Sequence, residues 1–192
     1  MASKAFIRPA TAQDIPKIKA IHDHYVYNSV LTLHEEPRPE NDISRRYSAV
    51  IERGLPYLVA QDEESRHILG YAYAFPFNRK VSGLAQTVEI NLLCHPNYTR
   101  QHIARNLLED LLAILRRPQS SGHANFFRPG VKPYQATQVI ACICIDELGP
   151  KGGLGLIDWY KQFGFQENGR FKKVGCKFDR WIDQVYLQVS LI

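Results

Sequence analysis

The sequence predicts an α/β fold in which a mixed central β-sheet carries helices on both faces. Two amphipathic helical segments come first, and strand-like segments rich in aromatic and β-branched residues follow them. The second half of the chain then alternates helix with strand, which is typical of a layered sheet with helices packed against it. A length of 192 residues suits one domain, so we expect a single domain over residues 1–192.

Two helices are expected in the first quarter of the chain. In residues 14–25, Asp14 is suited to cap a helix and Pro16 fits its first turn. Gly54 is suited to end a second helix over residues 41–53. The apolar residues expected to face inward are Ile15, Ile18, Ile21 and Tyr25 in the first helix and Ile43, Tyr47, Val50 and Ile51 in the second.

Strands and helices then alternate. Residues 62–66 are acidic and polar and are expected to form a hairpin turn. Residues 103–116 carry a wide apolar stripe of leucine and isoleucine, which predicts a helix with one buried face. The last helix is expected at 154–163. Strands are expected at 57–61, 68–77, 87–94, 139–145, 169–177 and 185–191.

Residues 117–135 interrupt this alternation. They contain three prolines, two glycines and two serines, so we expect a long loop inserted between a helix and a strand. Phe126 and Phe127 lie in the middle of the insertion. We expect them to cover either the substrate pocket or a surface that meets a partner.

The charge of the chain is mildly basic, with a net value of +5. Basic residues are scattered, and the densest runs are only pairs: Arg45-Arg46, Arg116-Arg117 and Lys172-Lys173. A nucleic-acid-binding protein usually concentrates Lys and Arg in one stripe, so we expect no nucleic-acid partner. A phosphate-rich cofactor and a merely solvated basic surface both remain compatible with this balance.

Cysteine usage and the N-terminus bear on location. The chain has four cysteines, and Cys142 and Cys144 are two residues apart, a spacing unlike that of paired zinc ligands. We therefore expect buried free thiols, no metal and a cytoplasmic location. The first residues show no secretory signal, and no apolar run approaches the ~20 residues of a membrane helix, so no membrane partner is expected.

Three features could carry chemistry. A strand at 87–94 runs through a short loop into the helix at 103–116, and the free N–H groups at a helix N-terminus favour an anion, although many such units bind nothing. Glu89 lies in an apolar strand, where burial would raise its pKa and suit a general base; the alternative is an exposed position on an edge strand. Tyr160 lies on the last helix, where an ordinary amphipathic position is the alternative.

The order of these motifs resembles that of the GNAT acetyltransferases, in particular the branch that includes phosphinothricin acetyltransferase. The resemblance extends from Ile7 to Gln188. It is carried by the segments IRPATAQDIPKIKAIHDHYV, HEEP, GLPYLVA, GYAYAFPF, TVE followed by HP and IARNLL, and GRFKKVGCKFDRWIDQVYLQ. Related enzymes often form dimers, so a homodimer is a further expectation by analogy.

The resemblance implies an N-acetyltransferase that uses acetyl-CoA and a small amine such as an amino acid or an amino-acid analogue. The amine would attack the thioester directly, with Glu89 as general base and Tyr160 as general acid. The pantetheine arm would pair with the backbone of Leu92, Leu93 and Cys94, and a backbone N–H near Leu93 would hold the thioester oxygen. The residues expected around the pyrophosphate are Thr99, Arg100, Gln101, His102, Ile103, Ala104 and Arg105.

Several positions depart from the family pattern. His102 stands where the phosphate loop normally has a glycine, which lets the backbone approach the phosphates. The asparagine usual before the last helix is missing, and the basic residue after the aromatic strand is displaced among Asn78, Arg79 and Lys80. These changes argue against phosphinothricin itself as substrate and leave open a GNAT fold repurposed for another reaction or for binding alone.

The acceptor pocket is expected from the same resemblance. The candidate substrate contacts are Tyr25, Leu33, His34, Tyr73, Phe75, Arg79 and Trp181. Aromatic residues with one arginine would fit a small amine that bears a carboxylate. Phe75 and Trp181 could equally be core residues. Acetylation of protein N-termini or lysines is the third possibility, but no segment resembles an extended peptide groove.

Overall fold

The computed structural model describes residues 5–78, 81–99 and 101–192. Within these ranges seven strands form one sheet in the order β1-β2-β3-β4-β5-β7-β6. The strands are β1 (Ala5–Pro9), β2 (Tyr57–Asp62), β3 (Ile68–Pro76), β4 (Thr87–Cys94), β5 (Gln138–Cys144), β6 (Gln166–Lys177) and β7 (Arg180–Ser190). The helices are α1 (Ile15–Asn28), α2 (Glu40–Ile51), α3 (Ile103–Arg116) and α4 (Gly155–Lys161), with short 3-10 turns η1 (Ala12–Asp14), η2 (Ser82–Leu84), η3 (Pro96–Tyr98) and η4 (Ser121–Phe126).

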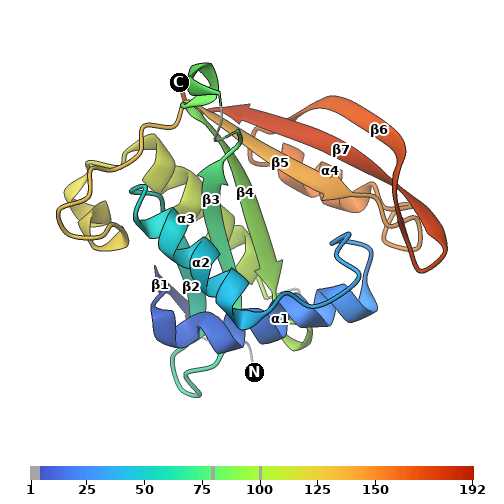
Figure 1. Ribbon diagram of the computed structural model, residues 1–192, viewed down its shortest axis with the longest axis horizontal. Helices are drawn as coiled ribbons and strands as arrows, with labels where there is room; N and C mark the ends of the chain where they lie inside the picture. Colours follow the sequence, from blue (N-terminus) through green and yellow to red (C-terminus); the bar gives the residue numbers. More distant parts are fainter. Residues whose placement is uncertain (1–4, 79–80, 100) are drawn as a thin grey trace.

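The sheet is antiparallel except between β4 and β5. These two strands pair in parallel only where Thr87–Ile90 lies beside Gln138–Ala141. Beyond this stretch β4 continues to Cys94 and β5 to Cys144, and the two strands diverge (Figure 1). Within the described ranges, the second half of β4 therefore has β3 on one side and no paired strand on the other.

Helices cover both faces of the sheet, as the sequence predicts. Gly70 of β3 faces α3, because a side chain there would lie 3.1 Å from Cδ1 of Leu107. Tyr71, the next residue, points to the opposite face, where it shares a cavity with Ile18 of α1 and Ile43 of α2. The helix α4 lies on the α3 side, since Arg105 of α3 donates a hydrogen bond to Gln162 just after α4.

Strand β1 is absent from the sequence-based prediction. Its five residues pair antiparallel with β2, about fifty residues further along the chain. The strand is short and ends at Pro9, so it gives little local signal. Its position comes from a distant partner that periodicity does not register.

Asp14 lies at the N-cap position of α1, but the predicted cap by its side chain is absent. The carboxylate instead accepts two hydrogen bonds of 2.8 Å from Arg8 and one of 2.8 Å from the backbone N–H of Thr11. Asp14 is buried, and its hydrogen bonds with Arg8 and Thr11 lower its pKa against the opposing effect of burial. This ion pair fastens β1 to the start of α1.

Residues 117–135 form the expected loop, and part of this loop packs against the core. They include η4, and Phe126 and Phe127 pack against the main core. The backbone N–H of Tyr134 donates to the carbonyl of Gly54, 2.8 Å away. Phe126 and Phe127 face Tyr47 and Ile51 of α2 rather than the cavity that contains Glu89. No helix in the described part of the chain is both long and apolar enough to cross a membrane.

Candidate active site

Strand β4 places Glu89 at the centre of the sheet. β4 is the fourth of seven strands, so the edge-strand alternative for Glu89 is wrong. Side chains alternate along a strand, and Glu89 and Asn91 therefore point to the same face. Their partners across β3 are Phe75 and Tyr73, respectively. This register builds a row of aromatic side chains beside the carboxylate.

A cavity of about 290 Å³ lies on this face, between the sheet and the helices α1 and α2. It brings together five of the residues predicted from the sequence: His34, Tyr73, Phe75 and Glu89, and also Leu93, which was predicted for the cofactor. Its size is close to the lower end for small-molecule sites, ~300 Å³. The lining residues that the sequence analysis missed include His22, Arg38, Arg46, Tyr57, Tyr71 and Asn91.

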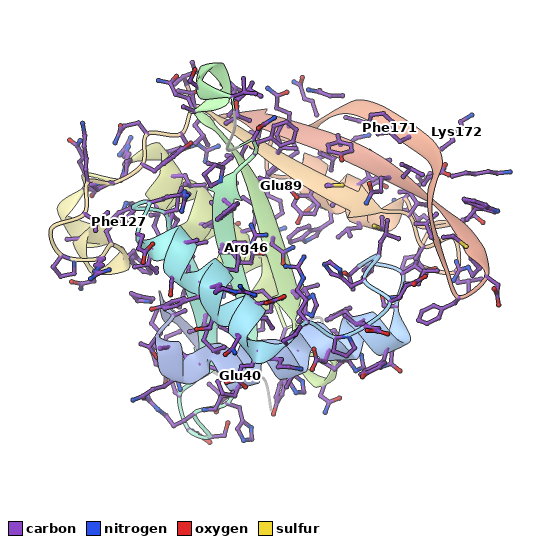
Figure 2. The ribbon with its side chains drawn as sticks, in the orientation of Figure 1. Glu40, Arg46, Glu89, Phe127, Phe171 and Lys172 are labelled. Carbon is purple, nitrogen blue, oxygen red and sulfur yellow. The ribbon has the colours of Figure 1, made fainter. Side chains whose placement is uncertain are left out.

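Glu89 is half-buried and its pKa is raised by burial, while the positive charge of Arg46 partly opposes this rise. The guanidinium carbon of Arg46 lies 4.1 Å from the centroid of the Phe75 ring. Figure 2 shows Arg46 on α2 and Glu89 on β4 in this part of the molecule. The arrangement provides a carboxylate that can accept a proton and a guanidinium that can bind an anion in the same cavity.

Arg38 is held by a histidine rather than by a carboxylate. Its Nε and Nη2 lie 3.0 and 2.7 Å from Nε2 of His34. Burial and the charge of Arg38 lower the pKa of His34, so this imidazole is neutral near pH 7 and its Nε2 accepts the hydrogen bond. Among the described residues neither Arg38 nor Arg46 forms an ion pair with a carboxylate.

Three tyrosines form the wall of the cavity along β2 and β3. The rings of Tyr57 and Tyr73 stack with centroids 4.7 Å apart. The ring planes of Tyr71 and Tyr73 are nearly parallel, at an angle of 5°. Burial raises the pKa of all three phenols, so they stay neutral at physiological pH. The wall is therefore mostly apolar, with a few hydroxyl groups that can donate.

A second hollow, of about 440 Å³, lies at the N-terminus of α3. Six residues predicted for the cofactor line it, namely Cys94, Thr99, His102, Ile103, Ala104 and Arg105, together with Tyr98 and Trp159, which the sequence analysis missed. Leu92 and Leu93 belong to the half of β4 that has no partner toward β5. Gln101 lies in the adjoining loop, and Arg100 lies outside the described residues.

His102 has a φ of +61° immediately before α3, which is the left-handed conformation that glycine adopts freely. The loop thus keeps a glycine-like backbone although the residue is histidine. Arg105 does not point freely into the hollow. Its guanidinium donates to Gln162 at 2.9 Å and to Glu109 at 3.1 Å.

Tyr160 is buried beside this second hollow. Its ring contacts Trp159 and Phe165 with centroids 4.9 and 5.2 Å away, and its hydroxyl forms no hydrogen bond with another described residue. Burial raises the pKa of Tyr160, and nearby Cys94 adds to the rise. Cys94 is itself buried enough to raise its pKa to about 12, so its thiol is a poor nucleophile.

Three predicted acceptor contacts lie outside the cavity lining. Tyr25 donates its hydroxyl to the carbonyl of Cys94 at 2.7 Å, and so connects α1 to the end of β4. Leu33 packs instead with Val30, Cys144 and Ile182. Trp181 is 64 % exposed on β7. Arg79 and Lys80 lie outside the described residues.

The burial of the cysteines differs from the expectation of buried thiols. No disulfide joins the described cysteines; Cys144 is buried, Cys94 and Cys142 are half-buried, and Cys176 is exposed. Within the described residues no group of three or more His, Cys, Asp or Glu side chains could hold a metal ion.

The sequence matches the acetyltransferase (GNAT) family over residues 23–126, more than half of its length. The chain therefore belongs to the GNAT family of acetyltransferases. Phosphinothricin N-acetyltransferase from Alcaligenes faecalis is 32 % identical over 185 residues, which cover 96 % of this chain and 82 % of the relative. The L-methionine sulfoximine/L-methionine sulfone acetyltransferase of Pseudomonas paraeruginosa is 28 % identical and covers 97 % of this chain and 95 % of its own.

Solved structures agree with this assignment. A phosphinothricin acetyltransferase from Sinorhizobium meliloti, solved with acetyl-CoA, has a TM-score of 0.78, 29 % identity and coverage of 99 % of this chain and 89 % of its own. An acetyltransferase from Salmonella typhimurium, also solved with acetyl-CoA, has a TM-score of 0.80 at 25 % identity, with coverage of 99 % and 95 %. The chain is an N-acetyltransferase of the GNAT fold.

Proposed function

We propose that this enzyme transfers the acetyl group of acetyl-CoA to the amine of a small molecule that carries a carboxylate, such as an amino acid or an amino-acid analogue. The observation that supports the acceptor class most strongly is the cavity in which Glu89 shares the lining with Arg38 and Arg46, two guanidinium groups that form no ion pair with a carboxylate among the described residues. The relatives named for phosphinothricin and for methionine sulfoximine act on molecules of this class.

The residues on the opposite side of β4 fit acetyl-CoA. The free edge at Leu92, Leu93 and Cys94 can hydrogen-bond an extended amide chain as an added strand would. The carbonyl of Cys94 already accepts one hydrogen bond from Tyr25, so the N–H and C=O groups before it are the better partners. The N–H groups at the start of α3 suit a pyrophosphate, and the left-handed backbone of His102 keeps the loop in the glycine-like shape. Acetyl-CoA, when bound, supplies the acetyl group as a thioester.

Glu89 is the proposed general base. An amino acid arrives with a protonated amine, and the Glu89 carboxylate removes that proton, directly or through water, so that the nitrogen lone pair can attack. Arg38 and Arg46 orient the acceptor by its carboxylate, and the tyrosine wall excludes water from the rest of the molecule. A backbone N–H near Leu93 is proposed to stabilise the developing oxyanion.

Tyr160 is the proposed general acid. Its buried phenol remains protonated at all physiological pH values and has no competing hydrogen-bond partner among the described residues. It lies near Cys94, at the end of the strand where the reaction would take place. The high pKa of the Cys94 thiol argues for direct transfer without an acyl-enzyme on that residue.

An amine screen tests the proposal. Purified enzyme with acetyl-CoA should release CoA and form an acetylated product, identified by mass spectrometry, with at least one of phosphinothricin, L-methionine sulfone or the standard L-amino acids. The Glu89→Gln variant is the matched control. Release of CoA with none of these acceptors, or only with peptides, would favour the repurposed-fold or peptide alternatives.

A homodimer is also proposed. The hairpin formed by β6 and β7 exposes apolar side chains beside the edge strand of the sheet: Phe171, Val174, Phe178 and Trp181 are 57, 52, 53 and 64 % exposed. Figure 2 labels Phe171 on this hairpin. Apolar side chains gathered on one element are typical of an interface. Light scattering after size-exclusion chromatography should give the mass of a dimer, and Trp181→Ser should weaken that dimer.

The cytoplasmic location stays a prediction.

A further inference from the structure

Lys177 is a buried cation that the proposed reaction does not use. It ends β6 and is only 2 % exposed. Its Nζ donates to the backbone carbonyls of Ser29 and Thr32, each at 2.8 Å, and lies 5.0 Å from the centroid of the Phe178 ring. No carboxylate among the described residues forms an ion pair with it. Burying a charge is unfavourable unless its donors are satisfied, so these two carbonyls determine where the ammonium group lies.

The two carbonyls belong to residues 29–34, which follow α1 and form one side of the acceptor cavity. Leu31, Thr32 and His34 line that cavity. The segment has little hydrogen bonding of its own: the Ser29 hydroxyl accepts from the N–H of Leu31, and the Thr32 hydroxyl accepts a long 3.4 Å bond from the N–H of His34. Among the described residues, only Lys177 connects the backbone of this segment by hydrogen bonds to a distant part of the chain.

Apolar contacts fix the segment to the same hairpin. Val30 is 1 % exposed and packs with Cys144 of β5, Ile182 of β7 and Leu33. Gly175 leaves room for Leu33, because a side chain there would lie 2.6 Å from Cδ1 of Leu33. This small cluster is separate from the main core, so Val30 and Leu33 pack on β5 and the hairpin, whereas His34 lies against His22 of α1 with ring centroids 5.7 Å apart.

We propose that Lys177 is a positioning residue for acceptor binding. It holds residues 29–34 against the β6–β7 hairpin, and His34, at the end of this segment, in turn orients the guanidinium of Arg38. Lys177 touches neither substrate, and its effect on the reaction passes through the segment. The effect on acceptor binding rests on the proposed function, but the effect on the segment itself does not.

The test compares Lys177→Met with Lys172→Met, which removes an exposed lysine five positions earlier on β6. Amide hydrogen exchange of residues 29–34, measured without ligand and relative to the amides of α3, should become at least about 10-fold faster in Lys177→Met only. With L-methionine sulfone as acceptor, the acceptor KM should rise by about 10-fold, while the acetyl-CoA KM stays within about 2-fold of the wild-type value.

Two further variants keep the proposal testable if Lys177→Met does not fold. Lys177→Gln retains one N–H donor group and should give an intermediate increase in exchange. Gly175→Ala forces Leu33 to move while Lys177 stays in place, and it should loosen the same residues. Unchanged exchange at 29–34, or exchange that is faster by the same factor in α3, would overturn the proposal. If wild-type enzyme does not acetylate L-methionine sulfone, the exchange result still decides the role of Lys177, and the failure concerns the proposed acceptor alone.

Discussion

The two hollows beside β4 differ in whether side chains or backbone groups would contact the ligand. On the α1–α2 face, the cavity around Glu89 is lined by side chains with charges and rings, including Arg38, Arg46 and the tyrosine wall. On the α3 side, Arg105 is already hydrogen-bonded within the protein, and the free groups are the strand edge of β4 and the N-terminus of α3. Acceptor recognition should therefore depend on side-chain identity, and cofactor recognition on backbone conformation.

Replacing Glu89 should have the largest effect. Glu89→Gln keeps the shape of the side chain but removes its ability to accept a proton. We expect kcat to fall by about 10³-fold, within the usual range for general-base catalysis. The rate of CoA release at saturating concentrations of both substrates measures kcat. Calorimetry should show an unchanged affinity for acetyl-CoA. A variant that retains more than about a tenth of wild-type activity would remove Glu89 from the role of base.

Removing the Tyr160 hydroxyl should have the next largest effect. Tyr160→Phe keeps the buried ring packed against Trp159 and Phe165. Loss of the proton donor should lower kcat by about 10²-fold, with little change in either KM. Thermal unfolding serves as the control, because the ring contacts remain. An unchanged kcat would mean that water protonates the leaving thiolate.

The comparison between the two hollows becomes sharper with Arg46. Arg46→Met should raise the acceptor KM by about 10- to 100-fold, the value of a charge-assisted hydrogen bond, and leave the acetyl-CoA KM unchanged. Steady-state kinetics with both substrates varied gives the two constants. Exposed Arg45, the preceding residue on α2, provides the matched control as Arg45→Met. Equal changes in both KM values would contradict the claim that the acceptor and acetyl-CoA are recognised by different residues in the two hollows.

The pH profile follows from the direction of the Glu89 pKa. Burial raises this pKa, and only the ionised carboxylate is a base, so kcat/KM should increase with pH through a value above that of an ordinary glutamate. Arg46 lowers the same pKa. In Arg46→Met the acid limb of the profile should therefore move to higher pH. A limb that does not move would place Arg46 too far from Glu89 to affect its ionisation.

The smallest effect is expected at His102. A side chain at φ +61° is strained by roughly 1 kcal/mol, and glycine would remove that strain. His102→Gly should bind acetyl-CoA about 2- to 5-fold more tightly, since the phosphates can approach the backbone more closely. Calorimetry measures the affinity. A drop of about tenfold would mean instead that the imidazole contacts the cofactor.

Much of the fold could be predicted because most helices and strands have a recognisable pattern in their own local sequence. The strand 87–94 and the helix 103–116 have the predicted bounds, since the first is a β-rich run and the second has an unbroken apolar stripe. Strand β1 could not be found in this way, because only pairing with β2 defines it. The insertion is a loop, as its prolines and glycines predict, but they give no signal that Phe126 and Phe127 pack onto the core.

Strand alternation could have located two of the cavity residues that the sequence analysis missed. Tyr71 lies two residues before Tyr73 and Asn91 two after Glu89, so both could have been placed on the same face. Arg38 and Arg46 gave no such signal, because their approach to Glu89 depends on how α2 and the segment before it dock on the sheet. Trp181 was predicted as a pocket residue from the family resemblance, but its side chain is exposed on the hairpin.

The most direct test of the account is calorimetric titration of the wild-type enzyme with acetyl-CoA, with free CoA as the comparison. The backbone groups of β4 and α3 should suffice for micromolar binding, about −8 kcal/mol. Binding of that strength, unchanged in Glu89→Gln, is the predicted result. Absence of binding at millimolar acetyl-CoA would contradict the account, because the histidine in the phosphate loop would then have abolished the cofactor site.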